Sequence, residues 1–230
     1  MSLIDSLRVA GAMARITGPS LVQLARGALT RSDVDERARW FGRRVVELLA
    51  VDLHASGMEH VPPGRAYVYM SNHQSHLDIP MLYATLPSPT IRMLGKKELF
   101  QIPLWGHALR AAEFIEVDRT NHKRAMRSID RAKELIRDGV SIYLAPEGTR
   151  SVTGKIGKLK KGGFHLATET ATPIVPVAIK GTIDILPRGT RVMHAGKRVD
   201  VTVGAPIEVE GREIADLMRE VEAFFKTHVE

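Results

Sequence analysis

Two residues that could do acid–base chemistry, His73 and Asp78, lie five positions apart, directly after the apolar run at 66–70. On a regular helix, side chains five positions apart are rotated by roughly 140° and do not meet. They can meet if His73 lies on the turn that leaves a strand and Asp78 lies in the first turn of a helix that begins near Ser75. The carboxylate would then bond one imidazole nitrogen and leave the other to accept a proton from a hydroxyl. For this pair alone, the alternative is a helix cap with no catalytic role.

Three further apolar segments end in polar or cationic residues. Residues 92–95 lead to Lys96, residues 114–117 lead to Asp118 and Arg119, and residues 141–145 lead through Pro146 to the sequence Glu-Gly-Thr-Arg at 147–150. In an open α/β sheet, ligands bind beyond the carboxyl ends of the strands. We therefore expect these segments to converge on one site that contains the His–Asp pair, two arginines, a glutamate and at least one lysine.

Four segments, 72–78, 114–119, 147–151 and 173–177, resemble in order and spacing the motif blocks of the glycerolipid acyltransferases, specifically the bacterial 1-acylglycerol-3-phosphate type. The resemblance covers about residues 55–210. It implies transfer of a fatty acyl group from a thioester donor, acyl-coenzyme A or acyl carrier protein, to the sn-2 hydroxyl of 1-acyl-sn-glycerol-3-phosphate, which gives phosphatidic acid. It implies no other cofactor. Glycerol 3-phosphate or another lyso-lipid as the acceptor, and an inactive membrane-binding module, stay open as alternatives.

The same resemblance implies catalytic roles for the first block. His73 would be the general base for the acceptor hydroxyl, and Asp78 would fix its tautomer and stabilise the imidazolium. The chain contains no cysteine, which excludes a thiol nucleophile. Ser75 is better suited to cap the helix than to act as a nucleophile. We therefore expect direct attack on the thioester, without a covalent enzyme intermediate.

The resemblance assigns the acceptor phosphate to Arg119 and Arg150, and a guanidinium suits that role because it can bond two phosphate oxygens at once. The Glu-Gly-Thr-Arg block would supply Glu147 to orient the substrate or an arginine. Gly148 would allow the backbone to approach closely, and Thr149 would lie beside the same substrate.

Other charged or ligating residues are weaker candidates. Lys96 and Lys160 are further substrate-binding residues by this reasoning, with a solvated surface face as the equally weighted alternative. His73, His76 and Asp78 offer three potential metal ligands, but they lack the four-residue helical spacing of paired-histidine metal sites. We therefore expect no metal.

The alternation of apolar strands and amphipathic segments predicts an α/β fold with a largely parallel central sheet flanked by helices. Strands are expected at residues 66–70, 92–95, 114–117, 141–145, 174–179 and 199–203. Helices are expected at residues 75–84, 103–110, 121–138, 159–169 and 213–228. We assign residues 52–230 to this α/β acyltransferase domain and residues 1–51 to an N-terminal element of amphipathic or hydrophobic helices.

The N-terminal element is apolar and basic, and Gly18-Pro19 is expected to break it into two helices. Neither piece reaches the ~20 apolar residues that a membrane-spanning helix needs. Together with the net charge of +7, this pattern favours helices that lie in the surface of an anionic membrane. Aromatic residues make up only 5% of the chain, which disfavours a nucleic-acid partner. We expect a peripheral protein on the cytoplasmic face of the cell membrane, with a hairpin packed on the same chain or on a second subunit as the alternative.

Overall fold

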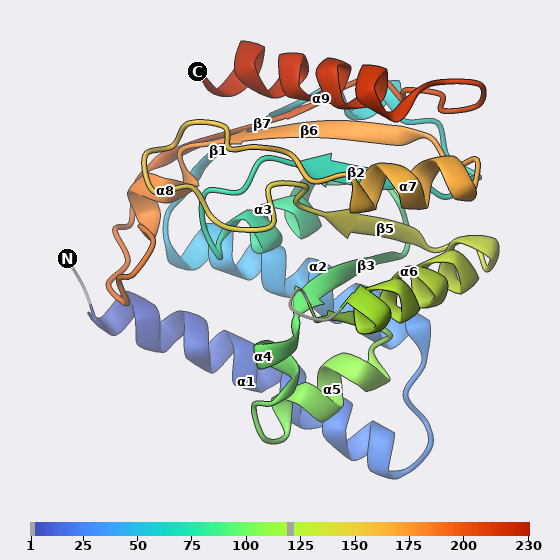
Figure 1. Ribbon diagram of the computed structural model, residues 1–230. Helices are drawn as coiled ribbons and strands as arrows, with labels where there is room; N and C mark the ends of the chain where they lie inside the picture. Colours follow the sequence, from blue (N-terminus) through green and yellow to red (C-terminus); the bar gives the residue numbers. More distant parts are fainter. Residues whose placement is uncertain (1–2, 119–121) are drawn as a thin grey trace.

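The computed structural model describes residues 3–118 and 122–230, and a single sheet forms its centre (Figure 1). In that part of the chain the sheet has seven strands in the order β1-β7-β6-β2-β5-β3-β4. Neighbouring strands are parallel except for β6 and β7. The prediction of a largely parallel α/β sheet is confirmed. The strands are β1 Asp52–Ser56, β2 Val68–Ser71, β3 Ile91–Lys96, β4 Ile115–Val117, β5 Ser141–Leu144, β6 Ile174–Lys180 and β7 Arg198–Val203.

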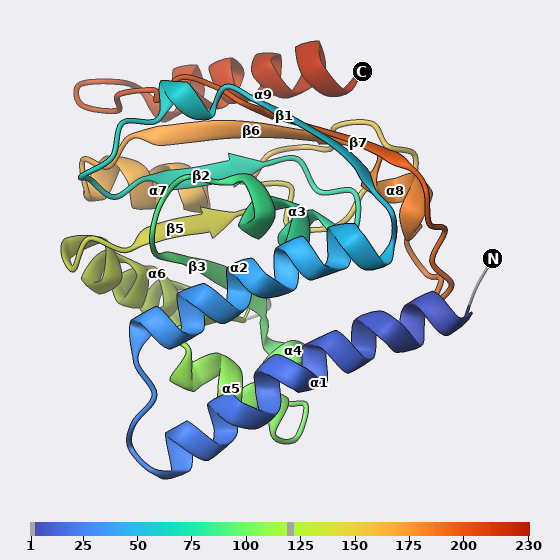
Figure 2. The same cartoon turned by 180° about the vertical axis from the view of Figure 1, so that it is seen from behind.

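Helices cover both faces of the sheet (Figures 1 and 2). α2 and α3 lie on one face, with α1 packed outside α2, and α6, α7 and α9 lie on the other. The short helices α4, α5 and α8 follow or precede individual strands. The bounds are α1 Leu3–Ala25, α2 Arg31–Leu48, α3 Asp78–Thr85, α4 Lys97–Phe100, α5 Trp105–Ala111, α6 His122–Arg137, α7 Gly162–Glu169, α8 Thr182–Ile185 and α9 Ile214–Val229, with a 3₁₀ turn at Met58–His60.

Strand β2 shows why the sheet could be located from the sequence. Successive residues of a strand point to opposite faces. Tyr67 and Tyr69 accordingly pack in the core beneath α2 and α3, while Val68 and Met70 pack in the core beneath α6, α7 and α9. Because both faces are buried, the strand reads as a continuous apolar run. The polar residues that follow it emerge at its carboxyl end, in the middle of the sheet.

Several elements differ from the expectation. The short helices α4 and α8 have no predicted counterpart, and β1 and α1 differ for reasons that the structure explains. β1 has no predicted counterpart, because it is an edge strand whose residues are mostly exposed and polar enough to hide the strand pattern. The expected break at Gly18-Pro19 is wrong, since α1 continues through it. Pro19 lies on the exposed side of the helix, where water can satisfy the carbonyl that its missing N–H leaves without a partner. The hydroxyls of Thr17 and Ser20 bond the carbonyls four residues earlier.

Helix α2 is part of the core rather than an appendage. Its residues Phe41 and Val45, and Leu49 directly after it, are buried in the cluster that fills one face of the sheet. At Gly42 an added Cβ would lie 2.6 Å from the carbonyl oxygen of Pro80, so α2 and α3 approach backbone to backbone. The expected boundary between the N-terminal element and the α/β domain, at residue 51, therefore lies within one continuous hydrophobic core.

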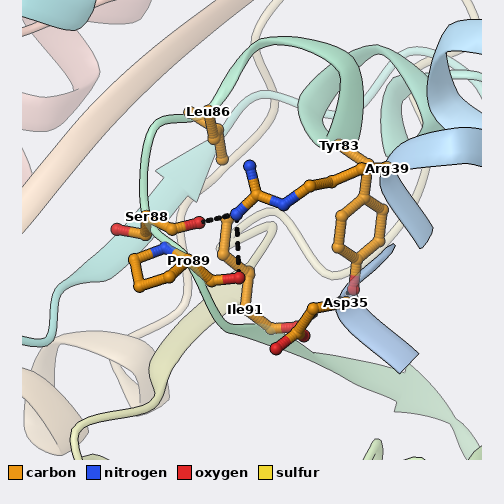
Figure 3. A pocket seen from close by; sticks show the side chains of 7 residues that line it. All are labelled: Asp35, Arg39, Tyr83, Leu86, Ser88, Pro89 and Ile91. Atoms are coloured by element: carbon orange, nitrogen blue, oxygen red, sulfur yellow. Dashed lines mark hydrogen bonds between the residues drawn. The ribbon is translucent and has the colours of Figure 1, made fainter. Parts of the chain in front are cut away.

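Polar contacts hold α2 to the loop between α3 and β3. Arg39 donates to the carbonyl oxygens of Ser88 and Pro89 at 2.5 and 2.8 Å (Figure 3). The fully buried Arg92 of β3 pairs with Asp35 of α2 at 2.5 Å. Because breaking a buried ion pair leaves an uncompensated charge, these contacts fix α2 on the sheet.

Candidate active site

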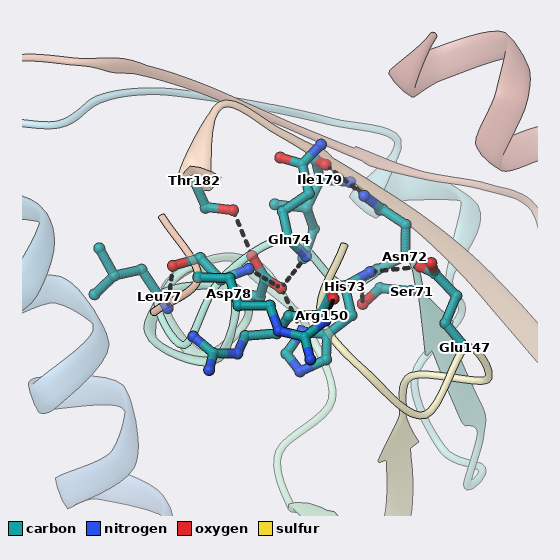
Figure 4. A network of polar contacts seen from close by, with 12 residues as sticks. Ser71, Asn72, His73, Gln74, Leu77, Asp78, Glu147, Arg150, Ile179 and Thr182 are labelled. Atoms are coloured by element: carbon teal, nitrogen blue, oxygen red, sulfur yellow. Dashed lines mark hydrogen bonds and ion pairs between the residues drawn. The ribbon is translucent and has the colours of Figure 1, made fainter. Parts of the chain in front are cut away.

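The predicted contact between His73 and Asp78 is confirmed at the carboxyl end of β2 (Figure 4). His73 Nδ1 lies 2.7 Å from Asp78 Oδ2. The preceding residue, Asn72, anchors the turn, because its side-chain amide both donates to and accepts from the backbone of Ile179 in β6, at 2.8 Å in each case. Asp78 is the first residue of α3, three residues later than the helix start expected at Ser75.

The carboxylate of Asp78 has no solvent exposure and is held by four donors. Oδ2 accepts from His73 and also from the backbone amides of Gln74 and Ser75, at 2.9 and 3.0 Å. Oδ1 accepts from the hydroxyl of Thr182 at 2.5 Å. Four donors fix the carboxylate in one orientation. It assigns the imidazole proton to Nδ1 and leaves Nε2 of His73 as the acceptor for a proton.

Ser75 is fully buried and its hydroxyl faces backbone groups. It donates to the carbonyl oxygen of Leu186 at 2.9 Å and accepts from the amide of Leu77 at 3.2 Å. These contacts satisfy both sides of the hydroxyl, which fits a structural role at the helix start rather than that of a nucleophile.

Glu147 holds two loops together, and its expected role in orienting the substrate or an arginine stays a prediction. Oε1 accepts from the backbone amide of His73 at 2.9 Å, and Oε2 accepts from that of Gly157 at 2.7 Å. The side chain is 5% exposed, and burial raises its pKa above the ordinary value. A third bond, from the amide of Ser151 to the carbonyl oxygen of His73 at 2.7 Å, ties the same loops.

The rest of the Glu-Gly-Thr-Arg block lies beside the pair His73 and Asp78, which we call the dyad. Arg150 is half-buried next to His73 and Asp78 (Figure 4), whereas Thr149 is exposed. Gly148 has φ +70°, and an added Cβ there would lie 3.0 Å from Nζ of Lys160. The glycine therefore lets the Lys160 ammonium approach the backbone of the loop, a contact that could not be read from the sequence.

Lys96 and Lys97 lie farther along the same sheet edge, at the end of β3 and the start of α4. β3 and β4 follow β5 in the sheet, so their carboxyl ends face the same way as those of β2 and β5. Lys96 is exposed and its ammonium lies 3.3 Å from Glu98. The adjacent Lys97, which sequence reasoning did not single out, lies 3.1 Å from the buried carboxylate of Asp118. Arg119 lies outside the described residues.

The segment after β6 completes the wall around the dyad. The amide of Gly181 donates to Oε1 of Gln74 at 3.2 Å, and Thr182 and Leu186 make the contacts with Asp78 and Ser75 given above. No local pattern points to this segment, because its partners are more than 100 residues away in the sequence. Within residues 3–118 and 122–230, no cluster of three histidine or acidic side chains has a geometry that could hold a metal ion.

A family model described as Acyltransferase matches residues 52–180. The chain is 33% identical over 156 residues to the chloroplast 1-acyl-sn-glycerol-3-phosphate acyltransferase LPAT1 of Arabidopsis thaliana, which covers 67% of this chain and 43% of that protein. It is 32% identical over 165 residues to 1-acyl-sn-glycerol-3-phosphate acyltransferase alpha of Mus musculus, which covers 71% of this chain and 58% of that protein. The chain thus spans about half the length of these relatives.

The crystal structure of the 1-acyl-sn-glycerophosphate (LPA) acyltransferase PlsC from Thermotoga maritima has a similar fold, with a TM-score of 0.85 and 29% sequence identity. The match covers 99% of this chain and 94% of that chain, so it includes the N-terminal helices as well as the sheet.

Proposed function

The chain belongs to the acyltransferase family, and we propose that it transfers a fatty acyl group from a thioester to the sn-2 hydroxyl of 1-acyl-sn-glycerol-3-phosphate, giving phosphatidic acid. The observation that carries this proposal is the His73–Asp78 pair, 2.7 Å apart at the carboxyl end of a central strand. The names of the similar proteins from plants, mouse and Thermotoga maritima support the choice of acceptor.

The geometry supports direct transfer from the thioester to the acceptor, without an acyl-enzyme. Nε2 of His73 takes the proton of the sn-2 hydroxyl while its oxygen attacks the thioester carbonyl and forms the new ester bond. Collapse of the tetrahedral intermediate breaks the carbon–sulfur bond, and the thiolate receives the proton from His73. Asp78 stabilises the imidazolium in between. With no cysteine in the chain and the Ser75 hydroxyl bonded to backbone, no covalent enzyme intermediate is needed.

Cationic side chains near the dyad suit a phosphate-bearing acceptor. Arg150 is the first of these, and Lys160 lies against the same loop. Arg119 and Lys96 stay candidates on the strength of the family resemblance. The donor is acyl-coenzyme A or acyl carrier protein, and the reaction calls for no further cofactor and no metal.

We also propose that the protein binds the cytoplasmic face of a membrane through α1 and the α4–α5 segment, which contact each other (Figure 2). At the start of α1, Leu3, Ile4 and Leu7 are 66%, 59% and 64% exposed. Apolar side chains on a basic helix enter the boundary between lipid headgroups and acyl chains. None of the described helices is long and apolar enough to cross a bilayer. The exposed apolar residues of the α4–α5 segment are Leu99, Ile102 and Leu104.

Thiol release from acyl-coenzyme A in nonionic detergent micelles tests the function. We offer 1-acyl-sn-glycerol-3-phosphate, glycerol 3-phosphate and a phosphate-free lyso-lipid in parallel, with His73→Ala as the control. Release that needs both 1-acyl-sn-glycerol-3-phosphate and His73 is expected. Release with a different acceptor would change the substrate but keep the mechanism. If neither acyl-coenzyme A nor acylated acyl carrier protein released its thiol with any acceptor, the result would favour an inactive membrane-binding module.

A further inference from the structure

Arg150 lies beside the His73–Asp78 pair (Figure 4), and the side chain of Arg188 contacts the backbone of Arg150. Nη1 of Arg188 donates to the backbone carbonyl oxygen of Arg150 at 2.9 Å. Burial lowers the pKa of the Arg150 guanidinium, and the neighbouring Arg188 charge lowers it further. Among the described residues, no carboxylate forms an ion pair with either side chain. Elsewhere on the surface, Arg65, Arg198 and Arg212 each pair with an acidic residue.

The position of Arg188 is set by the segment that also holds Asp78. Two residues earlier, the carbonyl oxygen of Leu186 accepts the hydroxyl of Ser75 at 2.9 Å. Arg188 then occupies the second position of a turn, in which the amide of Thr190 donates to the carbonyl oxygen of Pro187 at 3.3 Å and Gly189 takes φ +87°. A glycine at the third position allows this positive φ without strain. The turn therefore presents Arg188 to the loop that carries Arg150.

The charges of the Arg150 and Arg188 guanidinium groups repel each other, and an anion bound by both would remove that cost. In 1-acyl-sn-glycerol-3-phosphate, only carbon 2, carbon 3 and one ester oxygen separate the sn-2 hydroxyl from the phosphorus. When Nε2 of His73 contacts the hydroxyl, the phosphate must therefore lie within a few bond lengths of it. Arg150 lies beside His73 (Figure 4), and Arg188 contacts the loop that carries Arg150. A doubly charged phosphate has enough oxygens for two forked guanidinium contacts.

We propose that Arg188 is a second phosphate-binding residue of the acceptor site and acts together with Arg150. The assignment rests on the proposed function, because it places the phosphate relative to the hydroxyl that His73 deprotonates. It makes the connection between β6 and β7 a determinant of acceptor specificity.

The test compares Arg188→Gln with Arg191→Gln, which removes the same charge from an exposed position three residues along the same loop. In nonionic micelles, we expect Arg188→Gln to raise the KM for 1-acyl-sn-glycerol-3-phosphate roughly tenfold, as for loss of a charge-assisted hydrogen bond. The KM for the acyl donor should stay unchanged, and Arg191→Gln should match the unaltered protein. Equal KM values in the two variants, with transfer intact in the unaltered protein, would overturn the assignment and leave the proposed function standing.

Equilibrium binding of glycerol 3-phosphate tests whether Arg188 binds the phosphate even if no acyl transfer occurs. It is measured by calorimetry on the unaltered protein, Arg188→Gln and Arg191→Gln. Weaker binding by Arg188→Gln alone would support the phosphate site independently of the reaction. Unchanged binding would refute it. A defect confined to cosedimentation with anionic vesicles, with the micellar KM unchanged, would also refute it and assign Arg188 to the lipid surface.

Discussion

Replacing Thr182 with valine removes one hydroxyl from the centre of the candidate active site while nearly preserving the side-chain shape. Thr182 and Asp78 are both fully buried, and the bond between Oγ1 and Oδ1 is 2.5 Å long. Oδ1 would lose this donor, whereas Oδ2 would keep its bonds to His73 and to two backbone amides. The carboxylate would then be held from one side only.

The size of the effect follows from the charge and burial of the acceptor. Hydrogen bonds to charged groups contribute about 1.5–3 kcal/mol net, and a buried acceptor that loses its donor costs a similar amount. For a chain of this size, that loss lowers the Tm by roughly 3–12 °C. A carboxylate that is free to turn also orients His73 less well, and an energy of this size corresponds to a kcat lower by roughly tenfold or more.

Thermal unfolding and steady-state acyl transfer on three variants test this reasoning. Thr182→Ser keeps the hydroxyl and should retain most of the kcat. Thr172→Val removes another buried hydroxyl that bonds only the carbonyl oxygen of Thr170, at 3.2 Å, so it should affect stability but not kcat. Thr182→Val should lower the kcat with little change in either KM. If Thr182→Val kept the Tm and the kcat of the unaltered protein, the hydroxyl would not position Asp78.

Three other changes have defined outcomes. Arg150→Ala should raise the KM for the acceptor far more than that for the thioester, and equal effects would remove Arg150 from the phosphate site. Leu3→Ser combined with Leu7→Ser should weaken liposome cosedimentation with the Tm unchanged, because both side chains are largely exposed; a lower Tm would point to packing instead. The hydrogen bond from Arg31 lowers the pKa of Glu113 below its ordinary value of 4.5. Its contribution to stability is therefore present above that pH and lost as the pH falls through the lowered pKa. Glu113→Gln should thus show a smaller drop in Tm on acidification than the unaltered protein.

The elements that could be predicted from the sequence are those whose pattern is local. β2, β5 and β6 are buried on both faces, so each appears as an uninterrupted apolar run. The contact between His73 and Asp78 spans five residues and needs only a strand, a turn and a helix start. β1 escaped prediction because one exposed edge strand has no such run. α1 was divided at Gly18-Pro19 because the sequence does not show which face of the helix meets solvent.

The β6–β7 connection could not be assigned to the site, and the reason is topological. β6 lies beside β2 in the sheet, although about 100 residues separate them in the sequence. This pairing brings Thr182 to Asp78 and Leu186 to Ser75, and the pairing of β2 with β5 on its other side places Arg150 within reach of Arg188. The segment itself shows a short helix and a Pro–Gly turn, which occur in any loop. The His73–Asp78 pair can therefore be recognised from a local motif, whereas Thr182 and Arg188, which the fold brings to that pair and to Arg150, become visible only once the strand order is known.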